Sequence, residues 1–288
     1  MLDWAVGLSS KKRELMSNLK DRVIMITGAG SGFGALLAEG SLARGAKVVA
    51  LDLSKEGMAE RLGEQPNLLI HEGDVRRRPD LDDAVRSAMD TFGGVDILVN
   101  NAGTMPLAFY EDHAIASEAW DRCIDVNIKG VLNGIMAVYD TMIDQGQGHV
   151  VNLSSIYGNA GVAGSAVYSA TKAAVNELSN SLRLESQGKI KVTVVRPTGV
   201  PGTGLGQGVL NPLAIKGILG EHFESYLNTM EGAQSGQLSQ DEMSVDSIKY
   251  WGLAPEHLVD QILYAIDQPW GVVISDLTVR AANDRYVL

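Results

Sequence analysis

Short apolar runs alternate with longer amphipathic stretches along most of this chain of 288 residues. The runs are rich in Val, Ile and Leu, whereas the stretches between them carry apolar residues at helical spacing. Strands of a parallel sheet are buried on both faces and therefore read as continuous apolar runs. The pattern predicts an α/β fold, a single domain with a doubly wound parallel sheet (Rossmann-type) of about seven strands flanked by helices.

The same pattern predicts where the elements lie. Strands are expected at 22–27, 46–51, 67–72, 95–100, 148–154, 190–197 and 271–277. Helices are expected through Arg44 after the first strand, and then at 55–62, 80–92, 117–145, 166–187 and 254–267. Because an α/β domain of this length can enclose one core, residues 21–288 are predicted to form one domain.

Two segments fall outside the alternation. Residues 1–20 are predicted to be an N-terminal arm, since their short apolar run contains Asp3 and precedes the positive charges, unlike a secretory signal. Residues 198–250, called the insertion below, begin with many glycines. They then carry apolar residues near helical spacing, which predicts a lid over a substrate pocket. These apolar positions are Ile215, Leu219, Phe223, Leu227 and Met230.

Composition and charge exclude several classes of function. With a formal net charge of −11 the chain offers no basic surface for nucleic acid, and the cluster Arg76 to Arg78 is interpreted as a solvated loop. No apolar run reaches the roughly 18 residues that a membrane span needs. The single cysteine, Cys123, is interpreted as a packed residue, and the five scattered histidines predict no metal site. A reducing, cytoplasmic location is expected.

The segment TGAGSGFG, residues 27–34, follows the first predicted strand and opens the first helix. Gly28, Gly32 and Gly34 permit a tight turn, a close approach of the backbone to a pyrophosphate, and close helix packing. A strand-to-helix turn needs small residues in any case, so this loop alone is a weak signal for a dinucleotide site.

An acid after the second strand strengthens that signal. Asp52 follows Gly32 by about twenty residues, where a carboxylate accepts hydrogen bonds from both ribose hydroxyls of an adenosine. The order of strand, glycine loop, helix, strand and acid predicts a nicotinamide dinucleotide site. NAD is preferred over NADP because the carboxylate repels a 2′-phosphate. Asp74, after the third strand, is either a turn former or a contact to the adenine edge.

The segment VYSATKAAV places Tyr168 and Lys172 four positions apart in a predicted helix, and so on one face. The ordinary pKa of a tyrosine is ~10, and the nearby ammonium is expected to lower the pKa of Tyr168 enough for proton exchange near neutrality. The alternative is an aromatic anchor beside a surface lysine. Ser155, at the end of the fifth strand, favours catalysis, because its hydroxyl can orient a substrate oxygen.

Together these motifs resemble the short-chain dehydrogenase/reductase family across roughly residues 20–280. The chain shows TGAGSGFG for the family's TGxxxGxG, NNAG at 100–103, Asn127 in DVNIKG, Ser155, and Tyr168 with Lys172. The resemblance implies that Ser155 polarises the substrate oxygen and Tyr168 is the acid/base. It also implies that Lys172 lowers the pKa of Tyr168 and binds the nicotinamide ribose, while Asn127 kinks its helix and helps hold a water. The family's spacing to the tyrosine selects Ser155 over Ser154.

The motifs and the resemblance together give a set of expected cofactor contacts. These are Gly28, Ser31, Gly32, Phe33, Gly34, Asp52, Asp74, Val75, Asn101, Ala102, Gly103, Tyr168, Lys172, Pro197 and Val200. One departure is the segment 197–200, Pro-Thr-Gly-Val, where the family usually has Pro-Gly, so the nicotinamide contact near Val200 stays open. The resemblance also implies a homotetramer or dimer paired through the helices at 117–145 and 166–187.

The leading prediction is an NAD-dependent oxidoreductase that interconverts a secondary alcohol and a ketone. A carrier-linked 3-oxoacyl reductase shares the motifs, but Asp52 disfavours NADPH and the acidic chain suits an acidic carrier poorly. A non-catalytic NAD(H)-binding redox sensor would not need Ser155, Tyr168 and Lys172. Met105, Tyr157, Val162 and the insertion are expected to form the pocket, which suggests an apolar or aromatic-bearing alcohol.

Overall fold

The computed structural model describes residues 17–288 and has a seven-stranded sheet at its centre. The strands are β1 (Val23–Thr27), β2 (Lys47–Asp52), β3 (Leu68–Glu72), β4 (Ile97–Asn100), β5 (Gly148–Leu153), β6 (Ile190–Pro197) and β7 (Asp276–Val279). Their order is β3-β2-β1-β4-β5-β6-β7, and every neighbouring pair is parallel. The chain therefore winds outward from β1 in both directions, which confirms the predicted doubly wound, Rossmann-type fold.

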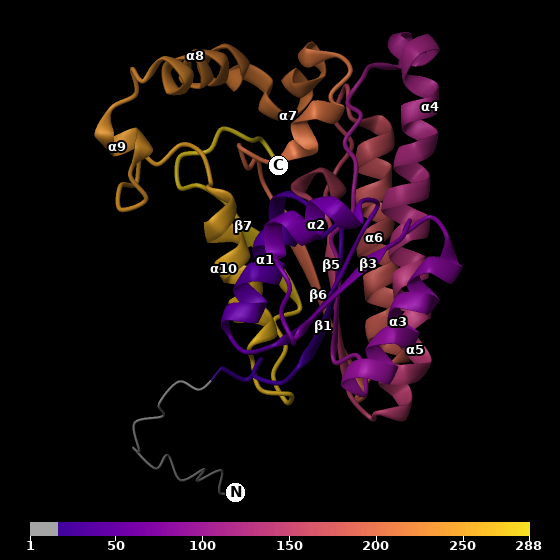
Figure 1. Ribbon diagram of the computed structural model, residues 1–288. Helices are drawn as coiled ribbons and strands as arrows, with labels where there is room; N and C mark the ends of the chain where they lie inside the picture. Colours follow the sequence, from indigo (N-terminus) through magenta and orange to yellow (C-terminus); the bar gives the residue numbers. More distant parts are fainter. Residues whose placement is uncertain (1–16) are drawn as a thin grey trace, which may run out of the picture.

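Helices cover both faces of this sheet. They are α1 (Gly32–Ala43), α2 (Lys55–Leu62), α3 (Arg78–Phe92), α4 (His113–Ile124), α5 (Gly130–Asp144), α6 (Ala166–Glu185), α7 (Lys216–Leu219), α8 (Phe223–Ser235), α9 (Gln240–Met243) and α10 (Pro255–Ile266). The helices α1, α2 and α10 lie on one face of the sheet, and α3, α5 and α6 lie on the other (Figure 1). Side chains of each group are buried against the face that it covers. None of the helices in residues 17–288 combines the length and apolar character needed to cross a bilayer.

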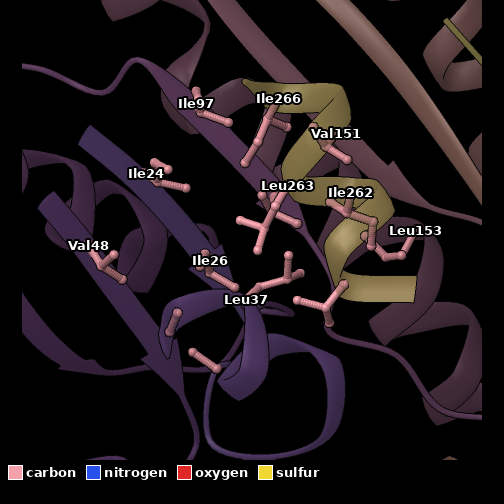
Figure 2. Close-up of a cluster of buried hydrophobic side chains, with 14 of the residues drawn as sticks. Ile24, Ile26, Leu37, Val48, Ile97, Val151, Leu153, Ile262, Leu263 and Ile266 are labelled. Carbon is pink, nitrogen blue, oxygen red and sulfur yellow. The ribbon is translucent and has the colours of Figure 1, made fainter. Parts of the chain in front are cut away.

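The core under α1 and α10 fixes the position of the first helix. Leu37 of α1 and Leu263 of α10 meet over Ile24 and Ile26 of β1 (Figure 2), and all four side chains are buried. Burying one such side chain stabilises the fold by about 1.5–3 kcal/mol. This packing holds the start of α1, and with it the glycine loop, at the carboxyl end of β1.

Two predicted elements differ in the structure. The helix expected at 117–145 is divided into α4 and α5 by a π-helical turn, Asp125–Lys129. The last strand, expected at 271–277, is found at Asp276–Val279. The Val272 N–H donates to the Pro269 carbonyl in a turn, and pairing with β6 begins where Val194 faces Asp276. An apolar run alone therefore did not locate this strand.

Residues 1–16 of the predicted arm lie outside the described residues. The rest of the arm belongs to the domain, because Leu19 is buried in the core beneath α10. The Ser17 hydroxyl and the Asn18 N–H both donate to the Asp267 carboxylate just after α10. Residues 17–19 therefore pack against the domain, and the predicted division between arm and domain stays a prediction.

The insertion carries α7, α8 and α9. Figure 1 shows these helices together at one end of the molecule, with the last residue of the chain beside α7. Leu219 and Phe223 are two of the predicted apolar positions. Both are buried in a hydrophobic cluster, separate from the cores on the two faces of the sheet, that also contains Tyr157 and Tyr168. Leu227, further along α8, is 38% exposed. The insertion is therefore docked through its first half.

Candidate active site

A cavity of about 900 Å³ lies between the carboxyl ends of the central strands and the insertion. It brings together nearly all of the predicted site residues, although they come from the ends of six strands and from α6. Those lining it are Gly28, Ser31, Gly32, Phe33, Asp52, Asp74, Val75, Asn101, Ala102, Gly103, Ser155, Tyr168, Lys172, Pro197 and Val200. Gly34 and Asn127 do not line the cavity, and each supports residues that do.

The backbone conformation of the glycine loop requires glycine at three positions. Gly28 has φ +67° and Gly32 has φ +50°, a region that favours glycine. A Cβ on Gly34 would overlap the Gly28 carbonyl oxygen. Asn101 holds the loop from below, since its Nδ2 donates to the carbonyls of Thr27 and Gly28 at 3.0 Å each. The resulting cradle at the N-terminus of α1 fits the phosphates of a dinucleotide.

Asp52 closes one end of this cradle. Its Oδ2 accepts the Gly30 N–H at 2.8 Å, and its Oδ1 accepts the Leu53 N–H at 2.6 Å. A Cβ on Gly30 would come within 2.9 Å of Oδ2, so the small residue lets the loop and the carboxylate approach. The remaining lone pairs of the carboxylate are available to accept hydrogen bonds from a ribose.

Asp74 is bound by Arg76, a member of the basic cluster that was predicted to be a solvated loop. Arg76 donates from Nε and Nη2 to the Asp74 carboxylate, at 2.8 and 2.5 Å to Oδ2. This hydrogen bonding lowers the pKa of Asp74. Arg76 also lines the cavity, so it is not simply part of a solvated loop. The position of Arg76 in the cavity lining could not be predicted from the sequence. Each arginine of the cluster has an acid nearby in the chain, and such a pattern is typical of paired charges on a solvated loop.

Tyr168 and Lys172 lie on the buried face of α6, and both side chains are almost inaccessible to solvent. The Lys172 ammonium donates to the Leu153 carbonyl at 2.8 Å and lies 5.7 Å from the centroid of the Tyr168 ring. The helix therefore brings the two groups together as their spacing predicts. The interpretation of this lysine as a surface residue is wrong.

The electrostatic effect on Tyr168 differs from the expected one. Burial raises the pKa of Tyr168, and the hydrogen bond with the Ser155 hydroxyl opposes that rise only in part. Burial also lowers the pKa of Lys172 to about 8. In the protein by itself, desolvation therefore outweighs the attraction of the ammonium for the phenolate. Without a cofactor the pKa of Tyr168 is therefore raised and not lowered, and the effect expected from Lys172 together with the positive nicotinamide ring stays a prediction.

The adjacent serines 154 and 155 have different partners. The Ser154 hydroxyl donates to the Lys172 carbonyl at 2.9 Å, which ties β5 to α6. The Ser155 hydroxyl accepts the Tyr157 N–H at 3.3 Å, and of the two serines only Ser155 affects the pKa of Tyr168, which it lowers against the effect of burial. Both serines line the cavity, but the Ser154 hydroxyl is bonded to the Lys172 carbonyl, so Ser155 is the serine whose hydroxyl can contact a substrate oxygen.

Asn127 sits in the π-helical turn between α4 and α5, where an irregularity was expected, and is completely buried. Its Oδ1 accepts the Thr104 N–H and its Nδ2 donates to the Thr104 carbonyl, each at 2.9 Å. The same Nδ2 lies 3.0 Å from the Thr171 hydroxyl, one residue before Lys172. Asn127 thus joins the segment after β4 to the catalytic helix. Its proposed contact with a water stays a prediction.

The other end of the cavity is largely apolar. Met105 and Tyr157 line it, as expected for a substrate pocket, whereas Val162 packs behind the lining. The insertion adds apolar side chains that include Leu205, Val209, Ile215, Tyr226 and Met230. Tyr286 also lines the cavity, although it is not among the residues predicted from the sequence. No local pattern marks it, because the fold alone brings it there from beyond β7.

The described residues contain no cluster of three or more His, Cys, Asp or Glu side chains that could hold a metal ion. Cys123 is buried, and burial raises the pKa of its thiol. The interpretation of Cys123 as a packed residue is confirmed.

The geometry agrees with what comparisons with known proteins find. A family model described as short chain dehydrogenase matches residues 22–211. An uncharacterised oxidoreductase of Staphylococcus aureus strain USA300 is 33% identical over 269 residues, which cover 92% of this chain and 99% of the relative. A solved structure of serine dehydrogenase in its closed form with NADP+ is similar, with a TM-score of 0.71 and 28% identity, covering 89% of this chain and 94% of that one. A short-chain dehydrogenase from Streptomyces avermitilis has a TM-score of 0.70 and 25% identity, covering 91% of this chain and 89% of that one.

Proposed function

The chain belongs to the short-chain dehydrogenase family of oxidoreductases, and from that membership we propose that it is an NAD-dependent enzyme that interconverts a secondary alcohol and a ketone. One observation carries the proposal. Ser155 and Tyr168 line the same cavity as the glycine cradle and Asp52. A dinucleotide bound along the cradle would reach toward the two hydroxyls, and the apolar end would take the substrate.

The proposed chemistry divides between the side chains. Ser155 orients the substrate oxygen through its hydroxyl. In alcohol oxidation, Tyr168 as phenolate accepts the hydroxyl proton while the hydrogen on the carbinol carbon leaves as hydride. In ketone reduction, the phenol returns the proton while the carbonyl carbon takes up a hydride. Bound NAD+ would supply the hydride acceptor for oxidation and a positive charge that favours the phenolate, and NADH would supply the hydride for reduction. Lys172 adds a second positive charge, because a pKa of about 8 leaves it mostly protonated at neutral pH.

Two further properties are proposed with this function. The NAD preference is supported by Asp52, whose carboxylate is held at the end of the cradle. A homo-oligomer, either a tetramer or a dimer, is supported by exposed apolar side chains on α4 and α5, including Ile124, Leu132 and Met136. The cytoplasm is the proposed location, because cells recycle NAD(H) internally and the single cysteine is a buried free thiol.

The proposed function is tested by following NADH absorbance over a panel of alcohols. The panel contains small, branched and aryl secondary alcohols, serine because of the similar serine dehydrogenase, and a 3-hydroxyacyl thioester. Turnover of secondary alcohols with NAD is expected. Turnover confined to the thioester with NADP would indicate the 3-oxoacyl reductase instead, and tight NADH binding without any turnover would indicate the redox sensor.

Tyr168→Phe tests the acid/base role. The ring packs as before and only the hydroxyl is lost, so kcat should fall about 10²-fold or more, while the Kd for NAD changes little. Tyr264→Phe, an exposed tyrosine on α10, is the matched control and should behave as wild type. A Tyr168→Phe enzyme that kept more than about a tenth of the wild-type kcat would show that another group transfers the proton.

A further inference from the structure

The segment after β7 folds back over the cavity. The Val287 N–H donates to the Ile218 carbonyl of α7 at 3.0 Å, so this segment, residues 281–288 and called the tail below, is bonded to the insertion. Figure 1 shows the end of the chain beside α7, at the same end of the molecule as α8. Two segments far apart in sequence thus meet above the carboxyl ends of the strands.

Arg280 fixes the path of the tail. Its Nε and Nη2 donate to the two oxygens of Asp284 at 3.1 and 2.6 Å, and the Asp284 side chain is only 4% exposed. The same guanidinium donates to the main-chain oxygens of Tyr286 at 2.8 Å and Leu288 at 2.6 Å. One arginine therefore bonds to three tail residues, and these bonds fix the backbone path on either side of Tyr286.

The Tyr286 hydroxyl lies against the loop that follows β6. A Cβ on Gly199 would overlap this hydroxyl, so the loop and the tyrosine are fitted to each other. That loop, residues 197–200, lines the cavity and is the segment expected to contact the nicotinamide. Contact with Tyr286 thus explains why position 199 is a glycine. Because this loop is expected to contact the nicotinamide, Tyr286 lies close to the end of the cavity where the reaction is proposed to occur.

Aromatic rings surround this position. The ring centroids of Tyr286 and Tyr226 are 6.0 Å apart in an edge-to-face arrangement, and their hydroxyl oxygens lie 3.4 Å apart. On the catalytic side, Tyr157 packs edge-to-face on Tyr168 with centroids 5.3 Å apart. Burial, together with Tyr226 and Tyr157, raises the pKa of Tyr286, so its hydroxyl is neutral at all physiological pH values.

We propose that Tyr286 is a specificity-determining residue whose ring, with that of Tyr226, forms a wall of the substrate pocket and selects alcohols and ketones that carry an aryl group. Flat rings at edge-to-face or offset geometry attract another aromatic ring beyond the effect of area alone. Met105 and Met230 also line the cavity, and thioethers pack well against aromatic rings. This proposal rests on the proposed function.

The test compares two secondary alcohols that differ only in one substituent, 1-phenylethanol and 2-propanol. The ratio of kcat/KM for the aryl alcohol to that for 2-propanol is expected to fall about tenfold or more in Tyr286→Ala. Tyr286→Leu, which keeps apolar volume but has no ring, should fall similarly and guards against misfolding of the smaller variant. Arg280→Gln should lower the same ratio, because the tail loses its bonds. Tyr286→Phe should keep the ratio within about threefold, because the ring stays.

A binding measurement separates this proposal from the proposed function. The Kd of acetophenone for the complex of the enzyme with NADH should rise about tenfold in Tyr286→Leu, whether or not the wild type turns over either alcohol. Tyr264→Ala on exposed α10 is the control and should change neither measurement. An unchanged ratio and Kd in Tyr286→Leu, an equal loss in Tyr286→Phe, or a wild type that does not bind acetophenone would overturn the assignment. A wild type that binds acetophenone without turnover would count against the proposed function alone.

Discussion

Lys172 is a charged group held almost entirely away from water, with 6% of its surface exposed. Its pKa is lowered to about 8, and the largest cause is burial. In the unfolded chain a lysine has a pKa of ~10.4. Between these two values the unfolded state binds more protons than the folded state, so folding stability rises with pH through this window. Below pH 8 both states are protonated, and the cost of burying the charge is fully present.

We therefore predict that the unfolding free energy of the wild type rises relative to that of Lys172→Met by about 2 kcal/mol between pH 8 and pH 9.5. Chemical denaturation of the cofactor-free protein at several pH values measures the difference. The range stops below ~10, where tyrosines of the unfolded chain begin to ionise. Lys189→Met, at an exposed position before β6, is the control and should show no such trend. If the difference in unfolding free energy between the wild type and Lys172→Met did not change with pH, burial would not destabilise the ammonium.

Asp52 is the second residue whose position leads to a measurable consequence. A 2′-phosphate about 4 Å from its carboxylate would meet a repulsion of roughly 4 kcal/mol at an effective dielectric near 20. Solvent screening reduces this cost. We expect kcat/KM to favour NAD over NADP by about ten- to a few hundredfold, and Asp52→Ala to remove most of that preference.

The measurement is kcat/KM for both cofactors with one substrate, in the wild type and in Asp52→Ala. Asp90→Ala, an exposed acid on α3, is the control for a change of net charge. Arg76 lies in the same lining, where its guanidinium is paired with Asp74. Equal use of both cofactors by the wild type would show that Asp52 does not face the ribose.

At the level of elements, the insertion divides into two parts that should behave differently. Ala214, Ile218, Leu219 and Phe223 are buried beside Tyr157 and Tyr168, so the segment 212–223 has a reason to stay docked. The segment 224–248 exposes Met243, Val245 and Ile248. Few buried contacts give a segment low local stability.

We predict that amide hydrogen exchange slows in residues 200–210 and 224–248 when NADH and a ketone bind, while 212–223 is protected in both states. The reason is that the glycine-rich entry and the distal part of α8 order over the cavity only with ligands. Peptides from α6 serve as the internal reference. If all parts of the insertion exchanged equally with and without ligands, it would be a permanently docked structure and not a lid.

For the whole molecule, the exposed apolar side chains of α4 and α5 bear on assembly. Ile124, Leu132 and Met136 are 40%, 38% and 39% exposed, and a helix pair that presents such side chains is suited to meet a second copy. We predict a dimer or tetramer in light scattering after gel filtration, and a smaller particle for Leu132→Glu. Met243→Glu, at an exposed apolar position in α9, should leave the assembly unchanged. A monomeric wild type would contradict the prediction.

The elements and their order could be predicted from the sequence because burial on one or both faces leaves a local period in the chain. The strand β1, the helix α2 and the long helix α6 all fall where the pattern places them. The strand β7 did not, since an apolar run shows burial but not the register at which a strand meets its neighbour. The π-helical turn at Asp125–Lys129 was expected only as a kink at Asn127.

Sequence alone also determined the parts of the candidate site that depend on spacing within one turn or one loop. The glycine cradle and the pair Tyr168 and Lys172 are of this kind, because a strand-to-helix turn and a helical period of four fix their geometry locally. Tertiary structure decided the rest. The pKa directions of Tyr168 and Lys172 follow from burial by segments distant in the chain. The contact of Tyr286 with Gly199 depends on the tail, which Arg280 and the bond between Val287 and Ile218 hold over the cavity. Such contacts leave no local pattern in the sequence, because tertiary packing brings together residues that are far apart in the chain.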